Sequence, residues 1–123
     1  FVIATGVTTT VREFIMLAFW ELCIVLEVKD QDKNEIGYIK ACYNVEFQLP
    51  IGKEVVAVDP RYFRPTEVDL LLGDPTKSNE ILGWKPKYDL QSLVKEMVAS
   101  DLKLAKKNEY LKLGGYEILN YFE

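Results

Sequence analysis

The sequence predicts a small α/β domain with three or four short strands and about three helices. Two segments, beginning at Thr10 and Asp89, carry a helix-start pattern followed by apolar residues at helical spacing. Two short runs rich in β-branched residues, at positions 24–28 and 54–58, have the length and composition of strands. A chain of 123 residues has the size of one domain and can bury a core. We therefore expect a single domain over residues 1–123.

Composition and charge argue against several classes of function. The formal net charge is −4, from 15 basic and 19 acidic residues, so we expect no nucleic-acid partner and no attraction to anionic membranes. No apolar run approaches the roughly 20 residues of a membrane span. No basic-then-apolar signal segment opens the sequence. We expect a cytoplasmic protein in which any anion site is formed locally by a few arginines.

The cysteines and histidines limit the chemistry further. The sequence contains Cys23, Cys42 and no histidine. A mixed Cys/His zinc site is therefore excluded, and the commonest general base is missing. Two cysteines leave a disulfide open as an alternative, but the plainer prediction is two reduced, mostly buried thiols. Any catalysis would rest on carboxylates, lysine or tyrosine.

The first predicted helix begins at Thr10, because Thr10 and Glu13 match the capping-box pattern. Apolar residues then follow the helical period and form a stripe that should face the core. This stripe consists of Val11, Phe14, Ile15, Ala18, Phe19 and Leu22. A second apolar face holds Met16, Leu17 and Trp20. We expect this helix to be covered on two sides, the second time by another part of a longer chain or by a partner subunit.

The segments after this helix are short. We predict a strand at residues 24–28, a charged turn at 29–34 and a second strand at 54–58. Residues 36–49 mix glycine, aromatic and polar residues, so we predict irregular structure there, with a short hairpin as the alternative. The sequence begins with the apolar Phe1 and without methionine, and we therefore expect a piece of a longer chain.

Two helices are predicted in the second half. Asp74 and Pro75 have the pattern of an N-cap followed by proline at the first helical position, and Gly83 predicts the end of that helix. Asp89 predicts the start of a long helix with one apolar stripe. The stripe consists of Leu90, Leu93, Val94, Met97, Val98, Leu102 and Ala105.

The residues best suited to bind a ligand lie in positions 58–77, VDPRYFRPTEVDLLLGDPTK. Arg64 precedes a proline, which favours an extended backbone and makes its side chain project from a stiff segment. A guanidinium binds two oxygens of a diphosphate at once. The Glu67 carboxylate could accept from two vicinal hydroxyls, as in a ribose diol. Alternatively, the two side chains pair with each other, or Glu67 stabilises a helix N-terminus; spacing alone slightly favours this alternative.

Other charged residues give weaker indications. Arg12 lies in the first turn of its helix, where a cation opposes the helix dipole. Arg12 either binds an external anion or carboxylate or is an ordinary surface residue, and the surface role is the favoured one. Asp59 is assigned to the start of a turn, and Arg61 to a surface charge or a subunit contact.

Catalytic motifs are missing from this sequence. It has no glycine-rich dinucleotide turn, no tyrosine followed four residues later by lysine, no G-x-S-x-G and no P-loop. The chain therefore holds binding groups but no complete catalytic set, and no catalytic, cofactor-binding or metal-ligating residue is assigned.

The central stretch allows a family to be suggested. Together with the later segment EILGWKPKYDLQSLVKEMVASDLKLAKK, it closely resembles the C-terminal part of the GDP-mannose 4,6-dehydratase family, within the extended short-chain dehydrogenases/reductases. FVIATG and TTTVREF resemble the start of that region, and GGYEILNYFE resembles its end. The resemblance implies a two-lobe enzyme, in which a Rossmann lobe holds NADP and the catalytic residues. A smaller substrate-binding lobe, which this chain matches without the Rossmann lobe, binds the GDP part of the substrate.

The resemblance also implies roles for individual residues. Arg64 matches the arginine that contacts the diphosphate, and Glu67 matches the acidic residue that reaches the ribose. Val11 and Arg12 match the segment that lines the nucleotide side. Met16 departs from the pattern, since relatives often carry a polar or basic residue there.

The sequence leads to three hypotheses about function. The first is the GDP-mannose-binding lobe of a homo-oligomeric, NADP-dependent hydro-lyase that converts GDP-D-mannose to GDP-4-keto-6-deoxy-D-mannose, with this chain alone inactive. The second is the corresponding lobe of another sugar-nucleotide dehydratase, epimerase or reductase. The third is a stand-alone nucleotide-binding or oligomerisation module, which the second apolar face of the first helix supports.

Overall fold

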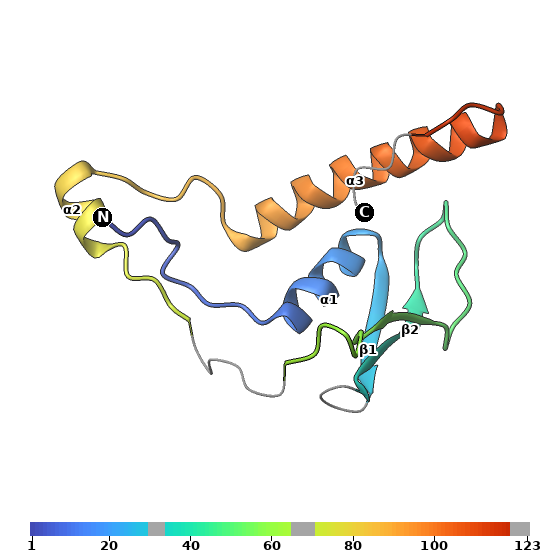
Figure 1. The fold of residues 1–123 in the computed structure, drawn as a ribbon, viewed down its shortest axis with the longest axis horizontal. Coiled ribbons are helices and arrows are strands. Elements are labelled where there is room, and N and C mark those ends of the chain that lie inside the picture. Colours follow the sequence, from blue (N-terminus) through green and yellow to red (C-terminus); the bar gives the residue numbers. More distant parts are fainter. Residues whose placement is uncertain (30–33, 65–70, 119–123) are drawn as a thin grey trace.

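The fold is a small α/β arrangement, as predicted, and is taken from a computed structural model that describes residues 1–29, 34–64 and 71–118. Those residues form three helices and one three-stranded sheet. The elements are, in chain order, α1 (Val11–Glu21), β1 (Ile24–Lys29), β2 (Ile36–Cys42), β3 (Glu54–Ala57), α2 (Thr76–Leu82) and α3 (Leu90–Leu113). Figure 1 shows α1 between the sheet and α3, whereas α2 lies with the N-terminus at the far end of the molecule.

The sheet is antiparallel, in the order β1-β2-β3. Strand β2 is therefore the central strand, so the prediction of irregular structure at residues 36–49 was wrong for its first half. Gly37 argued against predicting a strand, because glycine lowers the stability of a strand that has no neighbours. In the sheet Gly37 pairs with Val28 on one side and with Val56 on the other. Pairing on both edges outweighs the weak local propensity.

The core lies between this sheet and α1. Ile24, Leu26 and Ile39 are 2%, 4% and 0% exposed and form one buried cluster. Ile15 and Phe19 of α1 pack against this cluster. The predicted helical stripe thus faces the sheet, as its period requires.

Helix α1 begins as predicted, but several of its apolar residues are more exposed than we expected. Thr10 and Glu13 form the capping box, in which each side chain accepts from the other residue's backbone N–H. Val11 was assigned to the core stripe, but its side chain is 75% exposed, because it lies in the first turn, beyond the edge of the packed surface. Met16 and Trp20 of the second apolar face are exposed as well.

Helix α3 packs against α1 on the side of the predicted core stripe, so that stripe meets both the sheet and α3. Ala18 of α1 and Leu22, which caps its C-terminus, line a shared cleft with Val98, Leu102 and Ala105 of α3. Of the second apolar face, Leu17 lines a cleft with the first turn of α3, and the cover expected for Met16 and Trp20 stays a prediction. Asp89 is the N-cap of α3, as predicted, and its carboxylate accepts from the backbone N–H of Ser92 at 2.8 Å.

Helix α2 starts one residue later than predicted. Pro75 stands at its boundary instead of inside the first turn. The prediction of Asp74 as the N-cap was wrong, since Pro75 occupies that position and no side chain caps α2. The Asp74 carboxylate accepts from the backbone N–H of Thr76 at 3.0 Å and from its hydroxyl, which is a turn contact before the helix. Gly83 ends α2 in the left-handed conformation, with φ of 66°, as predicted.

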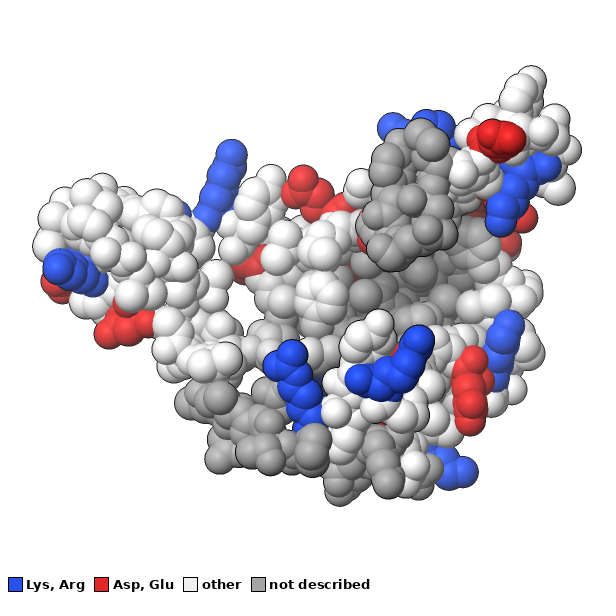
Figure 2. All heavy atoms as spheres, viewed as in Figure 1, with Lys and Arg blue, Asp and Glu red and all other residues white. Residues whose placement is uncertain are grey.

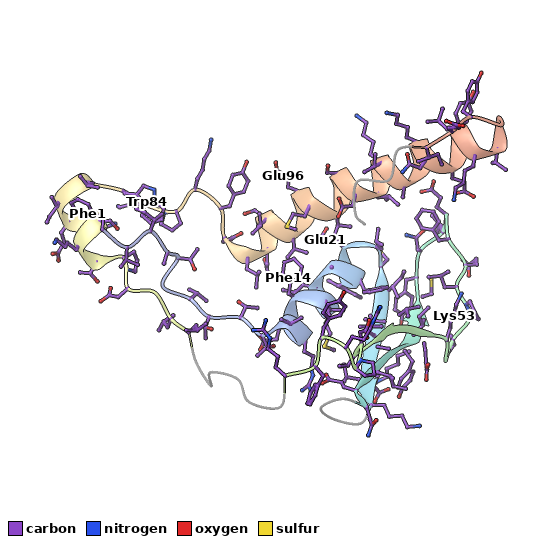
Figure 3. The ribbon with its side chains drawn as sticks, viewed as in Figure 1. Phe1, Phe14, Glu21, Lys53, Trp84 and Glu96 are labelled. Carbon is purple, nitrogen blue, oxygen red and sulfur yellow. The ribbon has the colours of Figure 1, made fainter. Side chains whose placement is uncertain are left out.

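Helix α2 and the N-terminal residues lie beside each other and form a narrow extension of the molecule; we call residues 1–8 and 71–84 the α2 arm. Thr8 donates to the carbonyl of Leu71 at 3.4 Å, and Ser78, which is buried, donates to the carbonyl of Val2 at 2.8 Å. Two segments distant in sequence therefore run antiparallel beside each other. Figure 3 places Phe1 and Trp84 at this end of the molecule, away from the sheet.

Both cysteines are free thiols. Cys42 is half-buried, but Cys23 is exposed, so the prediction of two mostly buried thiols was wrong for Cys23. Cys23 occupies the tight turn between α1 and β1 with a positive φ of 59°, a turn position that keeps its side chain at the surface.

Candidate functional site

A pocket of about 510 Å³ lies between the first turns of α1 and the sheet; we call it the α1 pocket. Such a volume lies within the range of small-molecule sites. Its lining residues come from α1, from all three strands and from their flanking residues. They are Thr10, Val11, Arg12, Ile15, Met16, Leu26, Val28, Glu35, Ile36, Gly37, Val56, Ala57 and Val58. Most of this wall is apolar, and among the lining residues that the structure describes the charged ones are Arg12 and Glu35.

Arg12 is held at the pocket by Glu35. Its Nε donates to Glu35 Oε1 at 2.7 Å. The Arg12 side chain is 51% exposed and the Glu35 side chain 24%, so the pair lies at the pocket's edge, partly open to solvent. The Glu35 carboxylate compensates the positive charge of Arg12, which the dipole of α1 disfavours in the first turn of the helix. This ion pair is formed within the chain and lies partly at its surface, so a role of Arg12 toward an external anion stays a prediction.

The backbone of Glu35 also takes part in this arrangement. Its carbonyl oxygen accepts from the N–H of Val58 at 3.3 Å. Glu35 therefore connects the first turn of α1, the start of β2 and the end of β3. Its hydrogen bond with Arg12, reinforced by the attraction between the charges, raises the pKa of the Arg12 guanidinium above its usual value.

The segment that follows β3 contains a second ion pair. Arg61 Nη2 lies 2.8 Å from Asp59 Oδ2, and the Arg61 guanidinium stands 5.5 Å from the centre of the Tyr62 ring. The hydrogen bonds from Arg61 lower the pKa of the Asp59 carboxyl. The two residues thus satisfy each other at a surface turn, which agrees with their assignment from the sequence.

The structure brings together only part of the predicted site. Val11 and Arg12 line the same pocket. Arg64 is exposed, six residues beyond Val58, and is not among the residues that line the pocket. Glu67 lies outside the described residues. The predicted roles of Arg64 and Glu67 therefore stay predictions.

Sequence reasoning missed Glu35 and Gly37. Glu35 ends a run of polar residues that reads as a solvated turn, and its partner Arg12 lies 23 residues earlier. Gly37 lies where a Cβ would stand 3.2 Å from the Cβ of Val56, so a larger residue would crowd the pocket wall. Neither position carries a local signal that separates it from its neighbours.

Three further features concern surface charge, metal-ligating side chains and the apolar character of the helices. On the face shown in Figure 2, basic and acidic side chains are interspersed instead of forming one basic patch. No cluster of three cysteine or acidic side chains that could hold a metal ion occurs within residues 1–29, 34–64 and 71–118. In the same stretches, none of the helices combines the length and apolar character needed to cross a bilayer.

Comparison with known proteins gives a consistent result. The sequence profile of the family described as GDP-mannose 4,6 dehydratase matches residues 1–97. A Vibrio cholerae protein named GDP-mannose 4,6-dehydratase is 44% identical over 119 residues, which is 96% of this chain and 32% of that protein. A Sinorhizobium fredii protein of the same name is 49% identical over 83% of this chain and 26% of its own length. A human protein named GDP-mannose 4,6 dehydratase is 41% identical over 88% of this chain and 27% of its own length.

The match extends over most of the chain but over only a minor part of each relative. The chain spans about a third of the length of the Vibrio cholerae relative, and this share covers both α1 with its pocket and the segment after β3. With a profile that matches residues 1–97 of 123 and relatives above 40% identity, the chain belongs to the GDP-mannose 4,6-dehydratase family.

Proposed function

We propose that this chain is the part of a GDP-mannose 4,6-dehydratase that binds the GDP portion of GDP-mannose. The observation that carries the proposal is the position of Arg12, a held guanidinium at the edge of a mostly apolar pocket of about 510 Å³. A nucleotide offers both kinds of partner, since its diphosphate is anionic and its rings have apolar faces. On this proposal residues 1–123 are a single substrate-binding lobe.

Within this proposal each predicted residue has a definite task. Arg12 binds the diphosphate from the pocket edge, while Val11 forms part of the apolar wall beside it. Arg64 supplies a second guanidinium, and Glu67 accepts from the ribose hydroxyls. With a net charge of −4, the chain needs such local cations, because its overall field repels a diphosphate.

The residues of this chain do not fit NADP, the dinucleotide expected for the parent enzyme. The sequence has no glycine-rich strand-to-helix turn for a pyrophosphate. The sheet of the described residues is antiparallel, whereas a dinucleotide fold needs parallel strands. We therefore derive no step through NADP, and we propose that the chain alone does not dehydrate GDP-mannose.

Titration calorimetry with GDP tests the proposal. We expect Arg12→Ala and Arg64→Ala each to weaken GDP binding by about tenfold or more, because each removes a charge-assisted hydrogen-bond donor worth about 1.5–3 kcal/mol. Arg61→Ala is the matched control, since it removes the same charge at an exposed turn whose residues do not line the α1 pocket and have no proposed contact with GDP. GDP binding that is equally strong in the Arg12→Ala variant would contradict the proposal.

Nucleotide specificity tests the substrate class. We expect GDP and GDP-mannose to raise the melting temperature of the chain more than UDP-glucose or a dTDP-sugar at the same concentration, because ligand binding to the folded state stabilises it. A larger shift with UDP or dTDP sugars would favour another sugar-nucleotide enzyme. No shift with any nucleotide would favour an oligomerisation module instead.

A further inference from the structure

Glu35 is placed where it can control the orientation of Arg12. Among the described residues, Glu35 is the hydrogen-bond partner of the Arg12 side chain, and it contacts Nε. Contact at Nε fixes the plane of the guanidinium, because Nε is the point at which the planar group joins its flexible stem. The two terminal Nη groups are the ones that form a fork for a bidentate anion. A carboxylate at Nε therefore orients this fork without occupying it.

The position of Glu35 is itself fixed. Its carbonyl oxygen accepts from the Val58 N–H at the end of β3, and β2 begins at the next residue. Its side chain is only 24% exposed, less than half the value for Arg12. Glu35 is thus the more rigidly held member of the ion pair. Through it, Arg12 is anchored to the sheet, and the segment that carries Arg64 follows the last strand of that sheet.

We infer that Glu35 is a positioning residue for nucleotide binding, which holds the Arg12 guanidinium so that its terminal nitrogens meet a diphosphate. The inference rests on the proposed function, since it specifies how Arg12 is prepared for GDP. A different role for Glu35 would be that of a competitor, which neutralises Arg12 until an anion displaces it. The single contact at Nε favours positioning, because a competitor would cover the Nη edge that the ligand needs.

The first experiment needs no ligand. In ¹⁵N-edited NMR spectra of the chain, a held Nε–H exchanges slowly with water and gives a sharp signal, which Arg12→Lys removes and so assigns. We expect Glu35→Gln to broaden or shift this signal and Glu46→Gln to leave it unchanged. Glu46 is the matched control, since it pairs with Lys106 at 2.8 Å in another part of the chain. A signal unaffected by Glu35→Gln would overturn the inference.

The second experiment measures GDP binding in a double-mutant cycle. We expect Glu35→Gln to weaken GDP binding roughly three- to tenfold when Arg12 is present, as for a half-exposed charged hydrogen bond. In the Arg12→Ala background the same change should have almost no effect, because there is nothing left to orient. Circular dichroism melts of each variant verify that it is folded at the titration temperature.

The outcomes separate the two proposals. If GDP binds and Arg12→Ala weakens it, but Glu35→Gln strengthens it or acts equally in both backgrounds, the positioning role is wrong and the proposed function stands. If GDP fails to bind the unchanged chain, or Arg12→Ala has no effect, the proposed function fails and the role of Glu35 fails with it. Rescue of binding by Glu35→Asp, which keeps the charge, would add support to positioning.

Discussion

At the scale of single residues, the parts of this molecule governed by near neighbours follow directly from the sequence. Thr10 and Asp89 each satisfy backbone N–H groups within three residues, so a short pattern is enough to predict them. Glu35 is different, because its contact with Arg12 joins residues 23 positions apart. Only the folded sheet brings them together, and the sequence shows each of them merely as a charge in a polar setting.

The capping role of Thr10 can be measured. Thr10→Ala should lower the free energy of unfolding by about 1 kcal/mol, since the first turn of α1 loses a side-chain acceptor. Urea denaturation followed by circular dichroism measures the change. Ser100→Ala, at an exposed position inside α3, is the control and should be nearly neutral. Equal effects of the two substitutions would contradict a capping role.

At the scale of elements, helices were easier to predict than strands. The starts of α1 and α3 and the end of α2 were predicted, and α2 itself began one residue late. Strand β2 was not predicted, because its stability comes from neighbours on both sides and not from its own composition. The same strand supplies Gly37 to the pocket wall, so missing the strand also meant missing part of the site.

The central position of β2 makes a prediction about stability. Ile39 is fully buried in this strand. Ile39→Ala should cost about 2–5 kcal/mol and Ile39→Val about 0.5–1.5 kcal/mol, because each leaves a cavity that the core fills only in part. Lys40→Ala, at the exposed neighbouring position, should change little. A similar effect at both positions, measured by urea denaturation, would show that β2 is not the centre of the core.

At the scale of the whole molecule, the sequence predicted the class of the fold but not its layering. The order sheet, α1, α3 arises because the apolar stripe of α1 is wide enough to meet both the sheet and α3, and the chain returns after α2 to lie against it (Figure 1). The number of apolar faces was visible in the sequence. Which segment covers each face depends on contacts between distant elements, and periodicity carries no information about them.

Three carboxyls among the described residues contribute to the response of the molecule to acid. Hydrogen bonds from Arg61, Thr76 and Ser92 lower the pKa of Asp59, Asp74 and Asp89 below the usual 3.8. A carboxyl whose pKa is lower in the folded state stabilises that state above its unfolded pKa, and the contribution disappears as the pH falls through the folded value.

We therefore expect stability to be level from about pH 7 to pH 5 and to fall below about pH 4. Urea midpoints measured across this range test the expectation. Asp89→Asn, which can still cap α3 but does not titrate, should show a smaller acid-induced loss than the unchanged chain. A loss of the same size would mean that Asp89 does not contribute to it.

The α2 arm has a consequence for the order in which the molecule folds. Strands β1, β2 and β3 pair with their neighbours in sequence, so short loops close them. The hydrogen bond from Ser78 to Val2 instead spans 76 residues. Closing so long a loop costs more chain entropy than closing a hairpin, and contacts of this kind slow folding. The sheet with α1 should therefore form first, and the two halves of the arm should join last, after the α1 pocket already exists.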